Sequence, residues 1–172
     1  VWNAPAGVNR GKITEAVGIE RTLTNGERDY LYENRINPIA NFPADGIVIW
    51  GQKTLQVAPT ALDRVNVRRL LLYVRKIVAT AVVPLIFEPN TPRLWRRFIN
   101  LVTPTFRDIK QREGLVDFRV VCDETTNTPA VIDRSEFRAR IFIKPTKAAE
   151  FIIVDFVLVN QSSTFNEFEQ GV

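Results

Sequence analysis

The stretch that decides the fold is residues 46–95, which read GIVIWGQKTLQVAPTALDRVNVRRLLLYVRKIVATAVVPLIFEPNTPRLW. Residues 47–50 are four consecutive strand formers, and their unbroken apolarity predicts a strand buried on both faces. From Asp63 to Ala81 apolar residues recur three and four positions apart, with arginine and lysine mostly on the opposite face. We therefore predict a basic amphipathic helix whose apolar face packs on a sheet.

A second helix is predicted to begin at Asn90-Thr91-Pro92 and to run to Arg112. Thr91 can cap the free N–H groups, and Pro92 loses no hydrogen bond at the first helical position. Pro104 should kink or divide this helix, because proline lacks an N–H and clashes with the preceding turn. Gly114 should close the second part.

The flanking sequence predicts shorter elements. Turn residues alternate with apolar ones over 1–21, which indicates an extended N-terminal segment, and a short helix over 27–36 follows the Asn25-Gly26 turn. A period of two predicts half-buried strands over 118–122 and 137–144. Residues 151–159, where only Asp155 is polar, predict a strand that is apolar on both faces.

These elements predict an α+β fold, a mixed β-sheet packed by two main helices with extended terminal arms. At 172 residues the chain suits one core. We expect an extended segment over 1–21, a single domain over 22–159, and a polar C-terminal tail or arm over 160–172. The first residues, VWNAPAG, have neither an initiator methionine nor the pattern of a secretory signal, so we expect the interior of a longer protein.

Composition excludes much of common enzyme chemistry. The chain has no histidine, so it contains neither a Ser-His-Asp nor a Cys-His relay, and no histidine-ligated metal. Its single cysteine, Cys122, excludes an internal disulfide and lies on an alternating apolar face, so we interpret it as a buried structural residue. Asp123-Glu124 is interpreted as a turn bonded to its own backbone rather than a cation site. No glycine-rich phosphate loop occurs and no apolar run is long enough to span a membrane, so we expect no enzyme, no cofactor and no membrane partner.

The net charge of +4 comes from 23 Lys and Arg against 19 Asp and Glu, so the placement of the cations matters more than their sum. A solvated helix face is the simplest interpretation. An acidic protein surface is the better functional partner, and a basic nucleic-acid-binding or other interaction domain is the alternative, which we disfavour because exposed aromatics are not interleaved with the arginines. The two clusters comprise Arg64, Arg68, Arg69, Arg75 and Lys76, then Arg93, Arg96, Arg97, Arg107, Lys110 and Arg112.

The predicted strand over 151–159 would be an aggregation site at an open edge, because it has no lysine, proline or bulge to protect it. We therefore expect another segment to cover it.

Seven pieces of the sequence, in order, resemble the C-terminal domain of contractile tail sheath proteins, found in myophage tails and phage-tail-like bacteriocins. Two departures are Lys53, where the family commonly has arginine, and Pro104, within a helix that is usually continuous. The pieces are Ala4-Pro5-Ala6-Gly7 with Arg10-Gly11; Ile36-Asn37-Pro38-Ile39; Gly46-Ile47-Val48-Ile49-Trp50-Gly51 with Lys53-Thr54-Leu55; Val65-Asn66-Val67-Arg68-Arg69-Leu70; Phe87-Glu88-Pro89-Asn90 before Leu94-Trp95; Cys122-Asp123-Glu124-Thr125-Thr126-Asn127; and Pro145 with Ala149-Glu150-Phe151.

The resemblance implies the inner domain of a sheath subunit, a structural protein that stacks as hexameric rings around a tail tube and contracts to drive the tube through a bacterial envelope. It implies a place in the virion tail, assembled in the host bacterial cytoplasm, with other sheath subunits and the tail tube protein as partners. Subunits of the family exchange strands, and we assign that linkage to Phe151, Ile152, Ile153, Val154, Phe156, Val157 and Leu158. The family's tube-binding helix is expected at Arg107, Lys110, Gln111 and Arg112.

Overall fold

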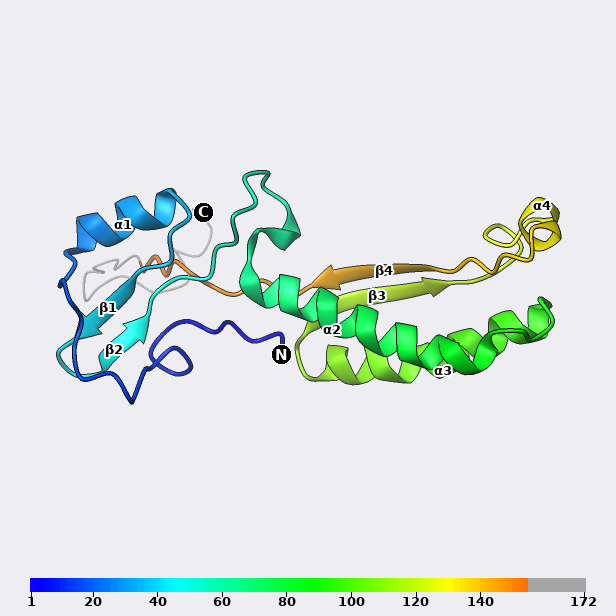
Figure 1. Ribbon diagram of the computed structural model, residues 1–172, viewed down its shortest axis with the longest axis horizontal. Helices are drawn as coiled ribbons and strands as arrows, with labels where there is room; N and C mark the ends of the chain where they lie inside the picture. The colour runs from blue at the N-terminus through cyan, green and yellow to red at the C-terminus, as the bar shows by residue number, and fades with distance from the viewer. Residues whose placement is uncertain (155–172) are drawn as a thin grey trace, which may run out of the picture.

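The computed structural model describes residues 1–154, which form two groups of elements along an elongated molecule (Figure 1). The first lobe, residues 1–54, holds α1 (Asn25–Glu33), β1 (Ile39–Phe42) and β2 (Gly46–Ile49). The second lobe, residues 61–145, holds the two long helices α2 (Val65–Val82) and α3 (Pro92–Gln111). It also contains β3 (Leu115–Val121), β4 (Arg140–Pro145), the short helix α4 (Pro129–Asp133) and the 3₁₀ turns Ala61–Asp63 and Val83–Leu85.

The first lobe begins its helix earlier than the sequence predicts. Thr24 caps α1 by a capping box: its hydroxyl accepts from the Glu27 N–H, and the Glu27 carboxylate accepts from the Thr24 N–H at 2.8 Å. Asn25 and Gly26, expected to form a turn, are therefore the first two residues of the helix. The side-chain cap wins over the local turn preference of Asn-Gly.

Strand β2 is paired on both sides. β1 lies antiparallel to it, with Ala40 opposite Val48, and the N-terminal segment runs along its other edge, with a bridge between Lys12 and Val48. Ile47 and Val48 are buried as expected, but Trp50 lies beyond the end of the strand and is 43% exposed. The expectation that all four apolar residues are buried is wrong for Trp50, which packs its ring against Phe42 instead.

The second lobe carries the main core. α3 packs on the β3–β4 pair, and α2 lies alongside α3 (Figure 1). The core cluster comprises Leu70, Val74, Leu85, Leu94, Trp95, Phe98, Val102, Phe106, Ile109, Leu115 and Cys122. The predicted apolar faces of both helices thus supply most of it.

Helix α3 is continuous through Pro104, so the prediction that this proline divides it is wrong. Pro104 itself is exposed, while Val102 and Phe106 on either side of it are buried. An interior proline costs about 3 kcal/mol. We attribute the continuity to packing of the flanking turns, because burying two large apolar side chains stabilises the helix by a comparable amount.

The end of α3 explains Gly114 differently from the sequence analysis. The N–H groups of Glu113 and Gly114 donate to the carbonyls of Lys110 and Ile109, which is a Schellman motif with Glu113 in the left-handed region at φ 60°. Gly114 closes the helix as predicted, but its missing side chain serves packing. A Cβ there would lie 2.9 Å from the Trp2 ring.

The α+β class with two main helices is confirmed, but the sheet is arranged differently. Within residues 1–154 there are two separate two-stranded antiparallel sheets, β1–β2 and β3–β4, rather than one mixed sheet. The helices α2 and α3 intervene in sequence between the two pairs. α4, which the sequence analysis missed, has five residues, too few to show a helical period.

After β4 the chain returns to the first lobe through residues 146–150, which we call the strap (Figure 1). Residues 151–154 follow and are not in a strand, contrary to the expectation for 151–159, and positions 155–159 lie outside the described residues. Within residues 1–154, the helices are too short or too polar to cross a membrane.

Candidate functional site

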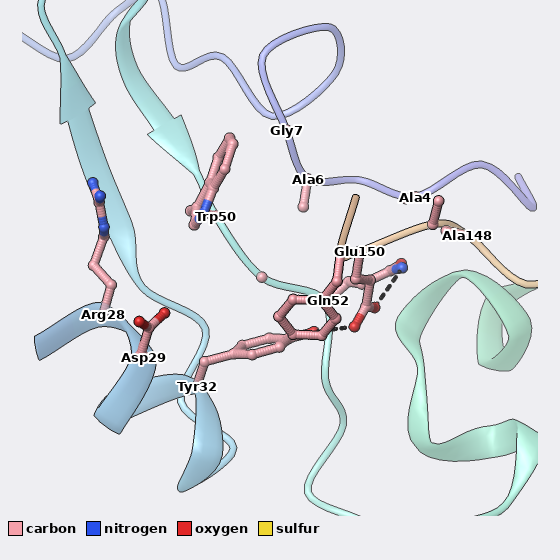
Figure 2. Close-up of a pocket in the computed structure, with 13 residues that line it drawn as sticks. Ala4, Ala6, Gly7, Arg28, Asp29, Tyr32, Trp50, Gln52, Ala148 and Glu150 are labelled. Carbon is pink, nitrogen blue, oxygen red and sulfur yellow. Dashed lines mark hydrogen bonds between the residues drawn. The ribbon is translucent and has the colours of Figure 1, made fainter. Parts of the chain in front are cut away.

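The strap meets the first lobe at a cluster of four side chains from distant parts of the sequence. Figure 2 shows Tyr32 of α1 and Gln52, which follows β2, pointing toward Glu150 of the strap. Arg64, just before α2, completes the group. We call Tyr32, Gln52, Arg64 and Glu150 the Glu150 cluster.

Three donors converge on the Glu150 carboxylate. The Tyr32 hydroxyl donates to Oε2 at 2.7 Å, and Arg64 Nε and Gln52 Nε2 donate to Oε1 at 2.7 and 3.1 Å. The Glu150 side chain is 16% exposed and that of Arg64 27% exposed. A charge-assisted bond to a partly buried carboxylate is among the stronger polar contacts of a protein.

Close backbone approach positions Tyr32 and Gln52. A Cβ on Gly51 would lie 2.8 Å from Asn37 Oδ1 and 3.0 Å from the Tyr32 ring, so glycine permits α1 to pack directly on this loop. The Asn37 side chain also bonds both the N–H and the carbonyl of Lys53, at 2.8 and 2.9 Å. The Lys53 ammonium in turn donates to the Tyr32 carbonyl and lies 4.1 Å from the centre of the Tyr32 ring.

Arg64 is fixed from two sides. The Val65 N–H donates to the Gln52 carbonyl at 2.8 Å, which holds the start of α2 beside the loop after β2. The Arg64 Nη1 contacts Asp63 Oδ2 at 2.8 Å, so the guanidinium lies between two carboxylates. Because the backbone at the start of α2 and the Arg64 guanidinium are already held, less conformational entropy is lost when Arg64 binds Glu150.

Burial and hydrogen bonding act in opposite directions on the pKa of Glu150. Burial raises the pKa, but the bonds from Arg64, Tyr32 and Gln52 outweigh it, so the pKa lies below that of an ordinary glutamate. Burial and the bond to Glu150 raise the pKa of Tyr32 well above its usual value. Near neutral pH the cluster therefore contains an ionised Glu150 and a neutral Tyr32.

Two cavities border the strap. One, of about 200 Å³, is lined by residues of the N-terminal segment, α1 and the loop after β2, with Gln52 among them (Figure 2). The other, of about 480 Å³, is lined by residues around the start of α2, with Asn66 among them. Gln52 Oε1 and Asn66 Oδ1 are buried and have no hydrogen-bond partner among the described residues. The strap therefore does not fill the hollow that it crosses.

The cluster has the chemistry of a structural clamp. Its one carboxylate is bonded by an arginine, a phenol and an amide, and residues 1–154 contain no group of three acidic or cysteine side chains suited to a metal. What the arrangement can do is hold the strap against the first lobe and against the start of α2.

The structure places the described part of the predicted linkage at the exposed end of the strap. Phe151, Ile152, Ile153 and Val154 are 77%, 84%, 86% and 62% exposed. Phe156, Val157 and Leu158 lie outside the described residues. The linkage itself stays a prediction, but the four described apolar side chains are uncovered in the isolated chain.

The predicted tube-contact residues lie together at the C-terminal end of α3, and all four are exposed. Two of them are paired within the chain, Lys110 with Asp117 at 2.7 Å and Arg112 with Asp108 at 3.6 Å. Trp2 also donates from its indole nitrogen to the Arg112 carbonyl at 2.9 Å and lies beneath the Arg112 guanidinium. The patch is therefore partly neutralised within the chain, which no local sequence pattern indicates.

The exposed cations of α2 differ from those at the end of α3. Arg68, Arg69, Arg75 and Lys76 are all exposed, and none forms an ion pair within the described part of the chain. The outer face of α2 is therefore the less neutralised of the two basic faces.

The turn after β3 is structural, as the sequence predicts. Asp123 Oδ1 accepts from the Thr125 hydroxyl and from the N–H groups of Thr125 and Thr126. Cys122 is buried, which raises the pKa of its thiol to about 11. The Asn127 amide bonds both the carbonyl and the N–H of Arg138, so it joins the end of this turn to the chain entering β4.

Sequence reasoning missed the Glu150 cluster. Glu150 is 118 positions from Tyr32, 98 from Gln52 and 86 from Arg64, and no local period relates residues so far apart. The nearest signal was Ala149-Glu150-Phe151, which the sequence analysis used as a matching piece without giving Glu150 a role.

Comparison with known proteins divides the chain between two family profiles. The profile described as "Phage tail sheath protein central domain" matches residues 1–55, and the one described as "Phage tail sheath C-terminal domain" matches residues 57–158. The tail sheath protein of Vibrio phage KVP40 is 39% identical over 166 residues, and that of Enterobacteria phage T4 is 35% identical over the same length. These matches cover 96% of this chain but 25% of each relative, so the chain spans about a quarter of their length.

Solved structures give the same result. The sheath complex of an extracellular contractile injection system, PVC, in its contracted state matches with a TM-score of 0.84 and 27% identity, covering 91% of this chain and 45% of that one. A chain of the contracted anti-feeding prophage baseplate matches with a TM-score of 0.82 and 26% identity, covering 92% of this chain and 47% of that one.

Proposed function

The chain belongs to the phage tail sheath protein family, and we propose that it forms the inner domain of a contractile sheath subunit that polymerises around a tail tube. It is a fragment of a contractile tail sheath subunit, and the family is structural rather than enzymatic. In the proposal, subunits stack as hexameric rings in the tail of a phage or related injection particle, assemble in the host bacterial cytoplasm, and contract to drive the tube through the envelope. The profile match over 57–158 carries the proposal.

We assign the linkage between subunits to strand exchange. Phe151 to Val154 are apolar and uncovered, and the β3–β4 pair has two outer edges that are unpaired within residues 1–154. A two-stranded sheet is marginal alone and its open edges can accept another strand. Residues 151–158 of one subunit would then complete a sheet of its neighbour.

Deleting residues 151–172 from the full-length protein tests this linkage. We expect folded subunits that form no sheaths under negative-stain electron microscopy. A sharper pair is Ile152→Pro with Ile153→Pro against the two alanine substitutions at the same positions. Proline removes the N–H donors that a strand needs, whereas alanine keeps them. Sheaths of normal length from the deletion or proline variants would refute strand exchange by this segment.

We assign tube contact to the end of α3, at Arg107, Lys110, Gln111 and Arg112. Exposed ion pairs are worth only about 0.2–1 kcal/mol each, so a few per subunit give an attachment that is firm when summed and still releasable. Reversing Arg107, Lys110 and Arg112 to glutamate should release the tube or trigger early contraction. The control reverses Arg68, Arg75 and Lys76 on α2, which carries a comparable charge. If only the α2 variant loses the tube, the contact lies on α2.

The nucleic-acid alternative rested on the basic helices alone, and family membership accounts for the chain without it. A salt-dependent mobility shift of the full-length protein with DNA would revive it.

A further inference from the structure

We propose that Glu150 anchors the segment that begins at Phe151, so that the Glu150 cluster fixes where and in which direction the chain from Phe151 onward, which we call the arm, leaves the subunit. The role assigned to the arm rests on the proposed function, whereas the anchor itself rests on the contacts of the unassembled chain. Glu150 is a positioning residue, and Tyr32, Gln52 and Arg64 form its receiving site.

Beyond Thr146, the strap is attached at one point, the Glu150 side chain. The Thr146 N–H donates to the Gly114 carbonyl at 3.4 Å, and every further hydrogen bond or ion pair described for residues 147–154 involves the Glu150 side chain. The neighbours of Glu150 on both sides, Ala149 and Phe151, are exposed. Two cavities border the strap, so close packing against its neighbours is not what holds it in place.

The receiving site is held together by contacts that do not involve Glu150. Gly51 allows Tyr32 to pack on the loop that carries Gln52, and Asn37 clamps that loop through the backbone of Lys53. Asp63 holds the Arg64 guanidinium. These contacts are made by residues 32–65 among themselves, so the site does not need the strap in order to form.

Glu150 also limits how far the start of the arm can move. Phe151 follows Glu150 directly, so holding Glu150 in place also holds the start of the arm in place. If Glu150 is released, the next attachment is Thr146, and four extended residues add about 13 Å of free chain. A strand that must enter a neighbour's sheet in register does not tolerate such freedom, because a slip of one residue reverses its two faces.

The experiment releases the anchor from the receiving side, so that the sequence around Phe151 stays unchanged. Full-length, unassembled subunits with Arg64→Ala or Tyr32→Phe are treated with chymotrypsin, and cleavage after Phe151 is followed by mass spectrometry. Cleavage there requires Glu150 to enter the protease cleft, so the bound cluster protects the site. Arg97→Ala is the control, because it removes an ion pair, with Glu88, from α3 away from the strap.

We expect cleavage after Phe151 to be about tenfold faster in Arg64→Ala, a few-fold faster in Tyr32→Phe, and unchanged in Arg97→Ala. We also expect Arg64→Ala to give short or disordered sheaths by electron microscopy. If Arg64→Ala fails to fold, Tyr32→Phe decides, since it removes one oxygen from a helix that remains capped. Unchanged cleavage in Tyr32→Phe and in any folded Arg64→Ala would overturn the anchor. Faster cleavage with normal sheaths would overturn the guiding role of the anchor. It would leave the proposed strand exchange standing, because the deletion of 151–172 and the proline variants test that exchange separately.

Discussion

Each of the two lobes is stabilised internally by a different kind of interaction. The second lobe has a continuous apolar core, to which α3 alone contributes six buried side chains. In the first lobe α1 buries no residue, and the buried apolar side chains are Pro38, Ala40, Ile47 and Val48. Polar and aromatic contacts add to this small core, among them the capping box, the Asn37 clamp, the cation–π pairs, the Phe42–Trp50 ring contact and the bonds from Tyr32 and Gln52 to Glu150.

The contrast shows that one chain can combine a lobe stabilised by apolar burial with a lobe whose contacts depend on geometry and ionisation. Apolar burial is non-directional and insensitive to pH, so the second lobe tolerates changes of charge around it. Hydrogen bonds and ion pairs depend on geometry and on ionisation, so the first lobe is fixed only while each contact is in place. The strap ends at Glu150, whose carboxylate accepts from Tyr32 and Gln52 of the first lobe and from Arg64 at the start of the second.

The largest expected effect comes from the apolar lobe. Phe106 is 1% exposed and stacks on Phe118 at 5.3 Å between ring centres. Phe106→Ala should lower the free energy of unfolding of the second lobe by about 3–5 kcal/mol, through lost burial and a cavity. Urea dependence of hydrogen exchange in α3 measures it. Phe142→Ala, on the exposed face of β4, is the control and should change it by under about 0.5 kcal/mol. Equal effects would remove the distinction between core and surface in this lobe.

A smaller effect is expected from a close contact in the polar lobe. Gly51→Ala would force a methyl group against Asn37 and Tyr32 and should destabilise the first lobe by about 1–3 kcal/mol. Gly26→Ala is the matched control, because a Cβ there meets nothing within 4 Å and alanine favours the helix by about 0.5–1 kcal/mol. Hydrogen exchange of the β1–β2 hairpin compares them. A harmless Gly51→Ala would mean that the loop can move away from α1, and would weaken the account of the receiving site.

The smallest effect concerns pH. Because the pKa of Glu150 is lowered on folding, its ionisation stabilises the folded chain above the unfolded glutamate value of about 4.3, and this stabilisation is lost as pH falls through the folded pKa. The charged group facing it is Arg64, which Asp63 also contacts, and the other donors, Tyr32 and Gln52, are neutral.

We expect Glu150→Gln to be less stable than the wild-type first lobe by about 1 kcal/mol at pH 7, with the difference shrinking toward zero in acid. Hydrogen exchange of the β1–β2 hairpin between pH 7 and pH 3 measures it. A difference that stays constant with pH would mean that the Glu150 charge does not contribute.

The sequence predicted those parts of the fold that depend on local pattern. The helical period gave both long helices, Thr91-Pro92 marked the start of α3, and alternation located β3 and β4. The errors occurred where another contact outweighs the preference of the residue itself. Packing of Val102 and Phe106 keeps α3 intact at Pro104, and the Thr24 cap draws Asn25 and Gly26 into α1.

By itself the sequence determined the fold class, the basic helices, the buried role of Cys122 and the resemblance to sheath proteins, because periodicity, composition and ordered motifs are written along the chain. Only the tertiary structure decided that the strands form two separate antiparallel pairs, that Lys110 and Arg112 are partly neutralised, and that Glu150 joins the strap to Tyr32, Gln52 and Arg64. The physical reason is separation along the chain. A carboxylate bonds whichever donors lie near it in space, and residues about a hundred positions apart share no local sequence pattern from which their contact could be predicted.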